Sequence, residues 1–444
     1  MNKNFDFATK LYNLRTKHGI SQKELAEGLG VTNKAVSKWE NAGAMPSLPQ
    51  LIRLSDLLHV SIDELVKPTI KKAKKIYKIA LTGGPCSGKS TALSWIQTEF
   101  TKKGYRVLFV PETATELILG GITPWTIDNN LNFESYILKL QLDKEKLFED
   151  AAKHLYKADK CLIVCDRGAL DTKAYMSKLE FDKCMQQLKT NEVALRDNYD
   201  AVFHLVTAAK GAEEFYTKEN NEARIESKEE AITKDEATLN AWTGHPHLRV
   251  IDNSTNFKEK MRRLMAEISS FLDEDGPYEI ERKFLIEYPD IKALEKMPNC
   301  KKVDIIQTYL KSNDDNQIRI RQRGENGYFT YTKTIKKTIT NTKRLEVESR
   351  IPVSEYIKLL LQADTNKHQI IKTRYCLMHN NQYFEIDVYP FWKDKAILEI
   401  ELTSEDQEIN FPKDIKIIKE VTGNKNYYNH TLATTPSLHE NKNA

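Results

Sequence analysis

A glycine-rich loop is the feature of this sequence whose residue types and spacing point most directly to chemistry. Its nine consecutive positions are Gly83, Gly84, Pro85, Cys86, Ser87, Gly88, Lys89, Ser90 and Thr91. In such a loop, glycines let backbone N–H groups close around phosphate oxygens, the lysine reaches the β and γ oxygens, and the serine hydroxyl holds Mg²⁺. An apolar strand over 78–81 precedes the loop, and a helix to about residue 103 follows it. We therefore expect ATP or GTP with Mg²⁺ or Mn²⁺ here, rather than a chance glycine turn.

Charged residues at two further strand ends add to this chemistry. The buried-type strand 161–165 is followed by Asp166, the position of a carboxylate that orders Mg²⁺, and then by Arg167. Glu112 follows an earlier strand; it is either a catalytic base for a hydroxyl nucleophile or an exposed strand-end carboxylate. Arg224 lies in a charged, helix-prone stretch, either as a cation in a lid over transferring phosphate or as a solvated helical charge.

The last third of the chain carries charged residues at alternate positions of short strands. These residues are Glu279, Glu281 and Lys283; Arg319, Arg321 and Arg323; Lys372 and Arg374; Glu385 and Asp387; and Glu399 and Glu401. Because side chains alternate across a strand, each group occupies one face. Two arrangements fit: the charges face water over an ordinary apolar core, or a barrel wraps them inward. Wrapped inward, carboxylates and guanidinium groups suit a divalent metal that bridges a polyphosphate.

Three segments of different pattern must position these residues. Residues 1–66 show helical periodicity, 77–273 alternates short apolar strands with long helices, and 277–436 consists of short alternating strands. The stretch 67–76 is a basic linker, and 437–444 is a polar tail. We therefore predict a multidomain chain with an all-α domain, an α/β domain built on a parallel sheet, and an antiparallel β-barrel.

Composition limits the class of protein further. Of 444 residues, 40% are hydrophobic and 9% aromatic, which suits a folded chain and argues against disorder. The net charge is +4, from 67 Lys+Arg against 63 Asp+Glu. Such a balance argues against a protein whose whole surface binds nucleic acid through positive charge. Six scattered cysteines indicate reduced thiols, and no apolar run is long enough for a membrane span. We expect a cytoplasmic protein.

The N-terminal segment carries clear helix-start signals. Ser21 and Glu24 form a capping box, and Thr32 caps the next helix. Over SQKELAEGLGVTNKAVSKWENAGAMPSLPQLIRLSDLLHVSIDEL the chain resembles the helix-turn-helix of the Cro/repressor (XRE) family. That resemblance implies that Trp39 is a core residue and that the DNA major groove is read by Gln22, Asn33, Lys34, Ser37 and Lys38.

Charge keeps a second interpretation of this segment open. Residues 1–66 hold eight Lys+Arg against seven Asp+Glu, a net of +1, so a protein-contact or dimerisation domain is the alternative to DNA binding. Attraction to phosphate would depend on the linker lysines at 67, 71, 72, 74 and 75. Repressor-type domains usually read paired half-sites as dimers, so a homodimer is one expectation. The sequence leaves the oligomeric state and the operator open.

The segment around the glycine-rich loop has further recognisable runs. GGPCSGKST, VPET, DRGALDT, EFYTKENNEAR and WTGHPHLRVIDN resemble the nucleoside-kinase-like P-loop domains, including the ribosylnicotinamide kinase part of the NadR regulator. They are more similar still to the NTPase domain of the TRPL translocation defect family. The resemblance implies that Glu112 is the base and that Asp166 and Arg167 act at the phosphates. No motif identifies the phosphate acceptor.

The C-terminal strands resemble the CYTH, or triphosphate tunnel, superfamily, through EIERK, RIRQR, RLEVE, EIDVYPF, LEIEL and VTGNKNYYN in the family's order. The resemblance implies metal ligands at Glu279, Glu281, Asp387, Glu399 and Glu401. It implies phosphate-binding residues at Lys283, which we also count as catalytic, and at Arg319, Arg321, Arg323, Arg344, Lys372 and Arg374. The family's strand lysine is either Lys333 or Lys336, which fall on opposite faces of a regular strand.

These features together predict a P-loop NTPase or kinase fused to a metal-dependent domain that binds or hydrolyses triphosphates, with a DNA-binding helix-turn-helix. The expected partners are a nucleoside triphosphate, a triphosphate-like ligand and DNA. The alternative is a non-enzymatic transcription regulator whose DNA affinity responds to nucleotide or polyphosphate. A module for phospholipid head groups or a protein partner is a third interpretation, supported by charge alone.

Overall fold

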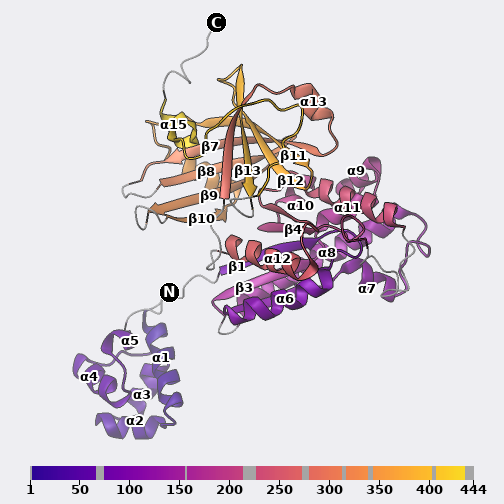
Figure 1. Ribbon diagram of the computed structural model, residues 1–444. Helices are drawn as coiled ribbons and strands as arrows, with labels where there is room; N and C mark the ends of the chain where they lie inside the picture. Colours follow the sequence, from indigo (N-terminus) through magenta and orange to yellow (C-terminus); the bar gives the residue numbers. More distant parts are fainter. Residues whose placement is uncertain are drawn as a thin grey trace. The chain divides into compact units, whose positions relative to one another are not determined.

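The computed structural model describes residues 3–66, 75–155, 158–213, 227–272, 280–312, 317–338, 344–402 and 407–435. The chain divides into two compact units, Met1–Lys74 and Lys75–Ala444 (Figure 1). Among the helices in these ranges, none is both long enough and apolar enough to cross a membrane.

The N-terminal unit is a bundle of short helices, as the sequence predicts. Its elements are α1 Lys3–Lys17, α2 Gln22–Leu29, α3 Asn33–Glu40, α4 Leu48–Leu57 and α5 Ile62–Val66. The capping box is present: Glu24 N donates to Ser21 Oγ at 3.2 Å, and Ser21 N donates to Glu24 Oε2 at 2.7 Å. Thr32 caps α3 as expected, and Trp39 lies in the buried core with Leu25 and Val36.

A five-stranded parallel sheet follows. Its strands are β1 Lys75–Thr82, β2 Tyr105–Val110, β3 Lys160–Asp166, β4 Ala201–Leu205 and β5 Leu248–Ile251, in the order β2-β3-β1-β4-β5. β1 begins inside the segment assigned to the linker, because Lys75 pairs with Lys160 and its N–H donates to Asp159 O at 2.9 Å. The strand order reverses at β1, and ligands of such sheets bind outside the strands' carboxyl ends at this point.

Helices cover both faces of this sheet. α6 Lys89–Lys102 and α12 Phe257–Phe271 pack on one face. The opposite face is covered by η1 Ala169–Tyr175, α8 Asn130–His154, α9 Lys178–Gln187, α10 Glu192–Arg196 and α11 Lys228–Trp242, and α7 Thr113–Leu119 follows β2. Within β3, Ile163 belongs to one core and its neighbours Leu162 and Val164 to the other. This burial on both faces explains the continuous apolar run of that strand.

The rest of the second unit is one antiparallel sheet. Its strands are β6 Ile280–Glu287, β7 Cys300–Leu310, β8 Gln317–Glu325, β9 Tyr328–Thr338, β10 Arg344–Arg350, β11 Ile370–His379, β12 Gln382–Val388, β13 Lys395–Leu402 and β14 Ile417–Glu420. Their order is β10-β9-β8-β7-β11-β12-β13-β6-β14. The helices α13 Ile291–Lys296, α14 Val353–Leu360 and α15 Asn429–Thr434 lie between or after the strands. The antiparallel architecture is confirmed. Among the described strands no ladder joins β10 to β14, so the predicted closure into a barrel is not confirmed.

The burial of side chains on the two faces of this sheet bears on the two arrangements that the alternation allowed. Phe384, Ile386 and Leu398 pack in an apolar cluster on one face. On the other face Asp387 is 0% exposed, Lys372 5% and Glu399 7%. The middle of this charged row is therefore buried, as the inward arrangement requires, whereas Glu281 and Glu401 near the ends of their strands are exposed.

Candidate functional site

Backbone geometry fixes the glycine-rich loop between β1 and α6. Gly83 has φ +141°, and a Cβ there would lie 2.1 Å from the carbonyl oxygen of Leu205. Gly88 has φ +95° and caps α6. Only glycine meets both requirements without strain. The loop therefore presents its backbone at the start of α6, where N–H groups and the helix dipole favour anions.

Lys89 folds back into this loop. Its Nζ donates to the carbonyl oxygens of Gly83 and Gly84, each at 3.0 Å, and to Ser87 Oγ at 3.3 Å. Burial, reinforced by repulsion from Arg167, lowers the pKa of Lys89 to about 8. Phosphate oxygens placed in the loop would replace these acceptors with charged ones.

Asp166 ends β3 beside the loop and has an acceptor available. Its Oδ1 is buried, and no hydrogen-bond partner is found for it within the described residues. Burial raises the pKa of Asp166, while the charge of Lys89 opposes that rise. A buried carboxylate oxygen with no donor, together with the Ser90 hydroxyl, is a donor set that fits Mg²⁺. A nucleotide–metal complex would satisfy the carboxylate.

Arg167 connects the two predicted strand-end groups to the loop. It adopts φ +67°. Its Nε donates to Glu112 Oε1 at 2.5 Å, and its Nη1 donates to Gly83 O and to Asp171 Oδ2, each at 3.3 Å. Burial alone would raise the pKa of Glu112, but Arg167 and a hydrogen bond from Thr115 outweigh it and lower that pKa. The pair makes Glu112 a weaker base and aims the guanidinium at the phosphate loop.

Asp171 is a residue of this site that sequence reasoning did not select. It is 3% exposed, and its oxygens accept from Thr82 Oγ1 at 2.7 Å and from Trp242 Nε1 at 2.6 Å. It thereby ties Arg167 to the end of β1 and to α11. Asp171 lies five residues after Asp166 in DRGALDT. This spacing in the sequence could have pointed to Asp171, but a separation of five residues does not place two side chains on the same face of a strand or helix.

Asp235 of α11 supports the loop from behind and was also missed. Its Oδ1 accepts from Gly84 N at 2.7 Å and from Thr207 N at 3.2 Å. It also faces His204 Nε2 at 3.2 Å. Burial would raise the pKa of Asp235, but these contacts outweigh it and lower the pKa.

A second site lies on one face of the antiparallel sheet, which we term the charged face. Strand register places on it Glu281, Lys283, Gln307, Tyr309, Arg319, Arg321, Lys372, Arg374, Glu385, Asp387, Glu399 and Glu401. Arg374 stands directly opposite Asp387, and Glu399 stands opposite both Glu385 and Lys283. The pairing thus brings together residues that are more than 100 positions apart in the chain.

Ion pairs interlace the charged face. Arg374 Nε donates to Asp387 Oδ1 at 2.7 Å and its Nη2 to Glu399 Oε2 at 2.8 Å. Lys283 Nζ lies 2.6 Å from Glu399 Oε1 and 3.1 Å from Glu281 Oε1. Burial opposes ionisation of Asp387, but Arg374 and the contacting Lys372 hold the pKa of Asp387 well below its usual range. Lys283, Lys372 and Arg374, three of the cations expected to bind phosphate, are thus paired with carboxylates.

The charged face carries more carboxylates than the three cations described above can neutralise. Glu385 faces Glu399, and Glu401 faces Glu281, across adjacent strands. Like charges in such positions destabilise a sheet. Burial and neighbouring carboxylates raise the pKa of Glu281 and of Glu385. Among the described residues, no three His, Cys, Asp or Glu side chains are arranged to hold a metal ion. Chemically, the hard oxygen donors fit Mg²⁺ or Mn²⁺.

Strand register separates the two candidate lysines. In the β8–β9 ladder Arg319 pairs with Thr334 and Arg321 with Thr332, so even-numbered positions of β9 share the charged face. Position 336 is therefore on that face, whereas Lys333 pairs with Ile320 on the apolar side. This corrects the inclusion of Lys333 among the phosphate-binding residues. The side chains of Lys336 and Arg344, like all of Arg224 and Glu279, lie outside the described residues.

Arg323 is a second correction. It was expected beside Arg319 and Arg321 as a phosphate ligand, but its Nη1 donates to Asp197 Oδ1 at 3.3 Å and its Nη2 contacts Gly244 O. Asp197 and Gly244 belong to the parallel-sheet domain. Arg323 is 6% exposed and holds the two domains together, because the end of β8 reaches that domain.

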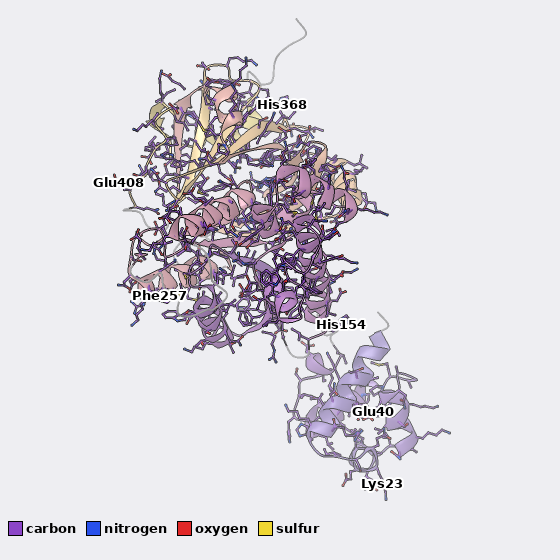
Figure 2. The ribbon with its side chains drawn as sticks, turned by 90° about the vertical axis from the view of Figure 1, so that its right-hand side faces the viewer. Lys23, Glu40, His154, Phe257, His368 and Glu408 are labelled. Atoms are coloured by element: carbon purple, nitrogen blue, oxygen red, sulfur yellow. The ribbon has the colours of Figure 1, made fainter. Side chains whose placement is uncertain are left out.

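On the N-terminal unit, the predicted DNA-facing residues lie around the start of α2 and on α3. Asn33, Lys34 and Lys38 are exposed, and Ser37 is half-buried. Gln22 is oriented within the fold, since its Nε2 donates to Glu40 Oε2 at 2.6 Å. Glu40 also pairs with Arg15 Nε at 2.6 Å and lies among the helices of this unit (Figure 2).

Family models match the chain in three successive parts. A model described as "Helix-turn-helix" matches residues 11–65, one described as "AAA domain" matches 78–260, and one described as "CYTH domain" matches 277–431. These matches confirm the three resemblances and their order.

Several known proteins are similar to separate parts of the chain. An inorganic triphosphatase of Acetivibrio thermocellus is 31% identical over 158 residues, which cover 36% of this chain and 94% of that protein. The HTH-type regulators YonR of Bacillus subtilis, described as uncharacterized, and BcrR of Enterococcus faecalis are each 41% identical over 14% of this chain. The chain spans 58% and 30% of those two regulators. The crystal structure of the inorganic triphosphatase NE1496 is 30% identical, covering 36% of this chain and 96% of that one, with a TM-score of 0.27.

Proposed function

This chain belongs to the CYTH family through residues 277–431, and on that premise we propose that its C-terminal domain hydrolyses triphosphates. The relative from Acetivibrio thermocellus is named an inorganic triphosphatase, so inorganic tripolyphosphate is the first substrate to consider. The observation that carries the proposal is the charged face, where Lys283, Lys372 and Arg374 meet four carboxylates, of which Asp387 and Glu399 are buried.

Each group on this face has a role in the proposed reaction. Lys283, Lys372 and Arg374, with Arg319 and Arg321, would bind phosphate oxygens through charge-assisted hydrogen bonds. Glu281, Asp387, Glu399 and Glu401 would hold Mg²⁺ or Mn²⁺, with Glu279 as a further proposed ligand. The bound metal would polarise the terminal phosphoryl group for attack by water. Where the face is buried, the reduced amount of water lowers the dielectric screening and strengthens the electrostatic attraction between these residues and phosphate.

The parallel-sheet domain is the second part of the proposal. We assign it ATP or GTP binding and phosphoryl transfer, either to water or to an acceptor. The supporting geometry is the loop around Lys89 and the buried Oδ1 of Asp166, for which the described ranges contain no hydrogen-bond partner. Arg167 would stabilise charge on the transferring phosphoryl group, with Glu112 orienting it; Arg224 remains a proposed second cation.

Phosphate release from full-length protein tests both parts. Tripolyphosphate, ATP and GTP would each be supplied with Mg²⁺ or Mn²⁺ to the wild type, Lys89→Ala, Glu399→Gln and the double variant. We expect Lys89→Ala to lose nucleotide turnover and keep tripolyphosphate turnover, and Glu399→Gln to do the reverse. Normal turnover of tripolyphosphate and of the nucleotides by the double variant would contradict the assignment.

The helix-turn-helix favours a second function, in which nucleotide or polyphosphate binding regulates transcription without turnover. The exposed Asn33, Lys34 and Lys38 on a separate compact unit support DNA binding. DNA binding would place the protein in the cytoplasm, and the homodimer remains a prediction for sedimentation to test. Footprinting with and without ATP or tripolyphosphate, beside the phosphate-release assay, separates regulator from enzyme: a DNA response without turnover favours the regulator.

A further inference from the structure

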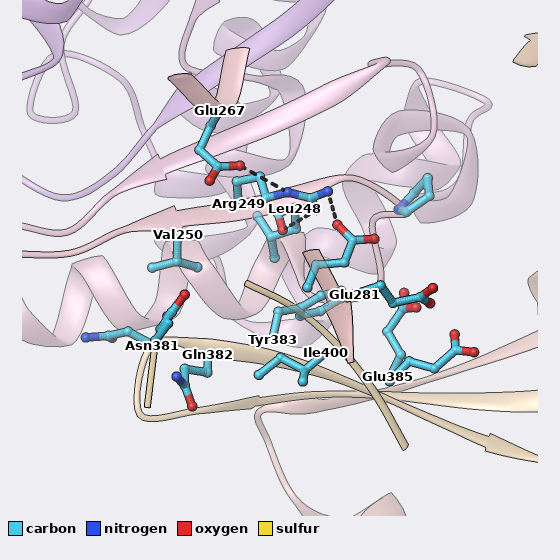
Figure 3. Close-up of a pocket in the computed structure, with 14 residues that line it drawn as sticks. Leu248, Arg249, Val250, Glu267, Glu281, Asn381, Gln382, Tyr383, Glu385 and Ile400 are labelled. Atoms are coloured by element: carbon cyan, nitrogen blue, oxygen red, sulfur yellow. Dashed lines mark hydrogen bonds and ion pairs between the residues drawn. The ribbon is translucent and has the colours of Figure 1, made fainter. Parts of the chain in front are cut away.

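A pocket opens between the parallel-sheet domain and the charged face. The parallel-sheet domain contributes Arg249 and its neighbours on β5, together with Glu267 of α12. The antiparallel sheet contributes four carboxylates, Glu281, Glu385, Glu399 and Glu401. Figure 3 shows Arg249 extending from β5 toward the strands that carry the carboxylates. Residues of both domains therefore border the proposed triphosphate site.

Arg249 is the one cation among the described residues that line this pocket, against five carboxylates. Its Nε lies 3.4 Å from Glu267 Oε2 (Figure 3). Its Nη2 pairs with Glu401. The side chain is 18% exposed, so it is neither sealed in a core nor free in solvent. The Arg249 guanidinium thus lies between two carboxylates, in a pocket whose other charged residues are acidic. A phosphate group that enters the pocket can replace one of these carboxylates as its hydrogen-bond acceptor.

The position of Arg249 complements the cations of the charged face. Lys283 and Arg374 hold Glu399, whereas Arg249 holds Glu401, two residues further along the same face of β13. Two residues of a strand span roughly 6.6 Å. The three cations therefore contact two neighbouring carboxylates on one face of β13, and a short phosphate chain along that face could meet all three.

His247 supports the placement of β5 at this site. It precedes Arg249 by two residues, and its Nδ1 is buried with no hydrogen-bond partner found within the described part of the chain. Burial lowers the pKa of His247 to about 4, and its charged neighbours include Arg249, Glu385 and Arg321. Both the acidic and the basic parts of the charged face thus come near this end of the parallel sheet.

We propose that Arg249 is a phosphate ligand of the triphosphate site, which is therefore built by both domains. This inference rests on the proposed triphosphatase function. It assigns to the parallel-sheet domain a contact with the C-terminal domain's substrate. A C-terminal domain without Arg249 would bind its substrate less tightly.

The test is steady-state hydrolysis of inorganic tripolyphosphate by full-length protein, with tripolyphosphate binding followed by calorimetry. We expect Arg249→Ala to raise KM about ten- to a hundredfold, as for loss of a charged hydrogen bond, with a smaller change in kcat. Arg249→Lys should recover part of the loss. Arg263→Ala is the matched control, because Arg263 pairs with Asp252 in the same domain and does not line the pocket.

The outcomes distinguish failure of the Arg249 assignment from failure of the proposed triphosphatase function. If the wild type turns over tripolyphosphate and Arg249→Ala matches it in KM, or has a lower KM, Arg249 is not a ligand. A rise in KM equal to that of Arg263→Ala would mean a general structural effect, and would also overturn the proposal. Wild-type protein that neither binds nor hydrolyses tripolyphosphate would remove the proposed function itself. ATP turnover at the Lys89 site reports that each variant is folded.

Discussion

Arg323 of β8 donates to the carboxylate of Asp197, which immediately follows α10, and this buried pair joins the parallel-sheet domain to the antiparallel sheet. Asp197 also accepts from Arg196 Nε at 2.7 Å and from Thr330 Oγ1 at 2.7 Å. Burial would raise the pKa of Asp197, but Arg196 and Arg323 hold it well below its usual range. The carboxylate is the shared anion of two buried guanidinium groups.

Asp197→Ala should destabilise the second unit. It would leave Arg196 and Arg323 buried without their common partner, and breaking such a pair costs about 3–5 kcal/mol. The measurement is the free energy of unfolding in urea. Asp150→Ala is the control, because the Asp150–Lys153 pair has side chains 54% and 59% exposed. An Asp197→Ala midpoint equal to that of the control would contradict the role assigned to this carboxylate.

Glu192 gives a pH-dependent contribution at the same contact between domains. Its Oε1 lies 2.8 Å from Lys173 Nζ and 2.9 Å from Lys301 Nζ. Burial opposes ionisation, yet the two lysines lower the pKa of Glu192 from 4.5 to about 2. A carboxylate whose pKa is lower in the folded state stabilises above its unfolded value and loses that effect as pH falls toward the folded one.

We therefore expect the difference in unfolding free energy between wild type and Glu192→Gln to be constant above about pH 5. It should shrink as the pH falls from 4.5 toward 2. Urea titrations at several pH values between 7 and 3 measure it. A difference that stays the same at pH 3 would show that Glu192 is not held ionised by its lysines.

Gly83→Ala should disrupt nucleotide binding. The added Cβ would lie 2.1 Å from Leu205 O, so the loop must move to accommodate it. Gly104→Ala is matched in backbone strain, since Gly104 also has positive φ, at +85°, but nothing lies within 4 Å of its Cβ position. We expect a loss of ATP binding by calorimetry in Gly83→Ala only, while Gly104→Ala costs about 1 kcal/mol of stability. Equal ATP affinity in both variants would contradict this account of the loop.

Lys336 and Lys333 provide a test of the sheet register. Lys336→Ala should raise KM for tripolyphosphate about tenfold or more if Lys336 is a phosphate-binding residue, as proposed, since the change would then remove a charged contact. Lys333→Ala should leave KM and kcat within about twofold, because a substitution outside such contacts has little effect. The opposite result would mean that β9 pairs with β8 in a register shifted by one residue, since such a slip exchanges the faces.

Lys34 and Lys38 test the DNA surface. In binding assays over a range of salt concentrations, Lys34→Ala with Lys38→Ala should weaken affinity and lower the salt slope by about 1 to 2. Lys17→Ala, exposed at the end of α1, is the control outside α2 and α3. Equal salt slopes for the two would favour the protein-contact interpretation of this unit.

Local pattern was sufficient for most of the fold. The capping residues Ser21 and Thr32, the strand around 161–165 and the glycine spacing from Gly83 to Gly88 each depend on neighbours a few positions away. The charged face was also visible, because alternation assigns residues such as Glu399 and Glu401 to the same side of one strand. Whether that side was buried depended on the strands beside it.

By itself, the sequence determined which residue types share a loop, a strand face or a helix end, since these follow from backbone periods of a few residues. The tertiary structure alone decided which of them meet across the chain. It paired Arg249 with Glu401, took Arg323 to Asp197, placed position 336 rather than 333 on the charged face, and brought Asp171 and Asp235 behind the phosphate loop. Contacts between segments distant in sequence depend on sheet register and domain packing, for which no short spacing gives a signal.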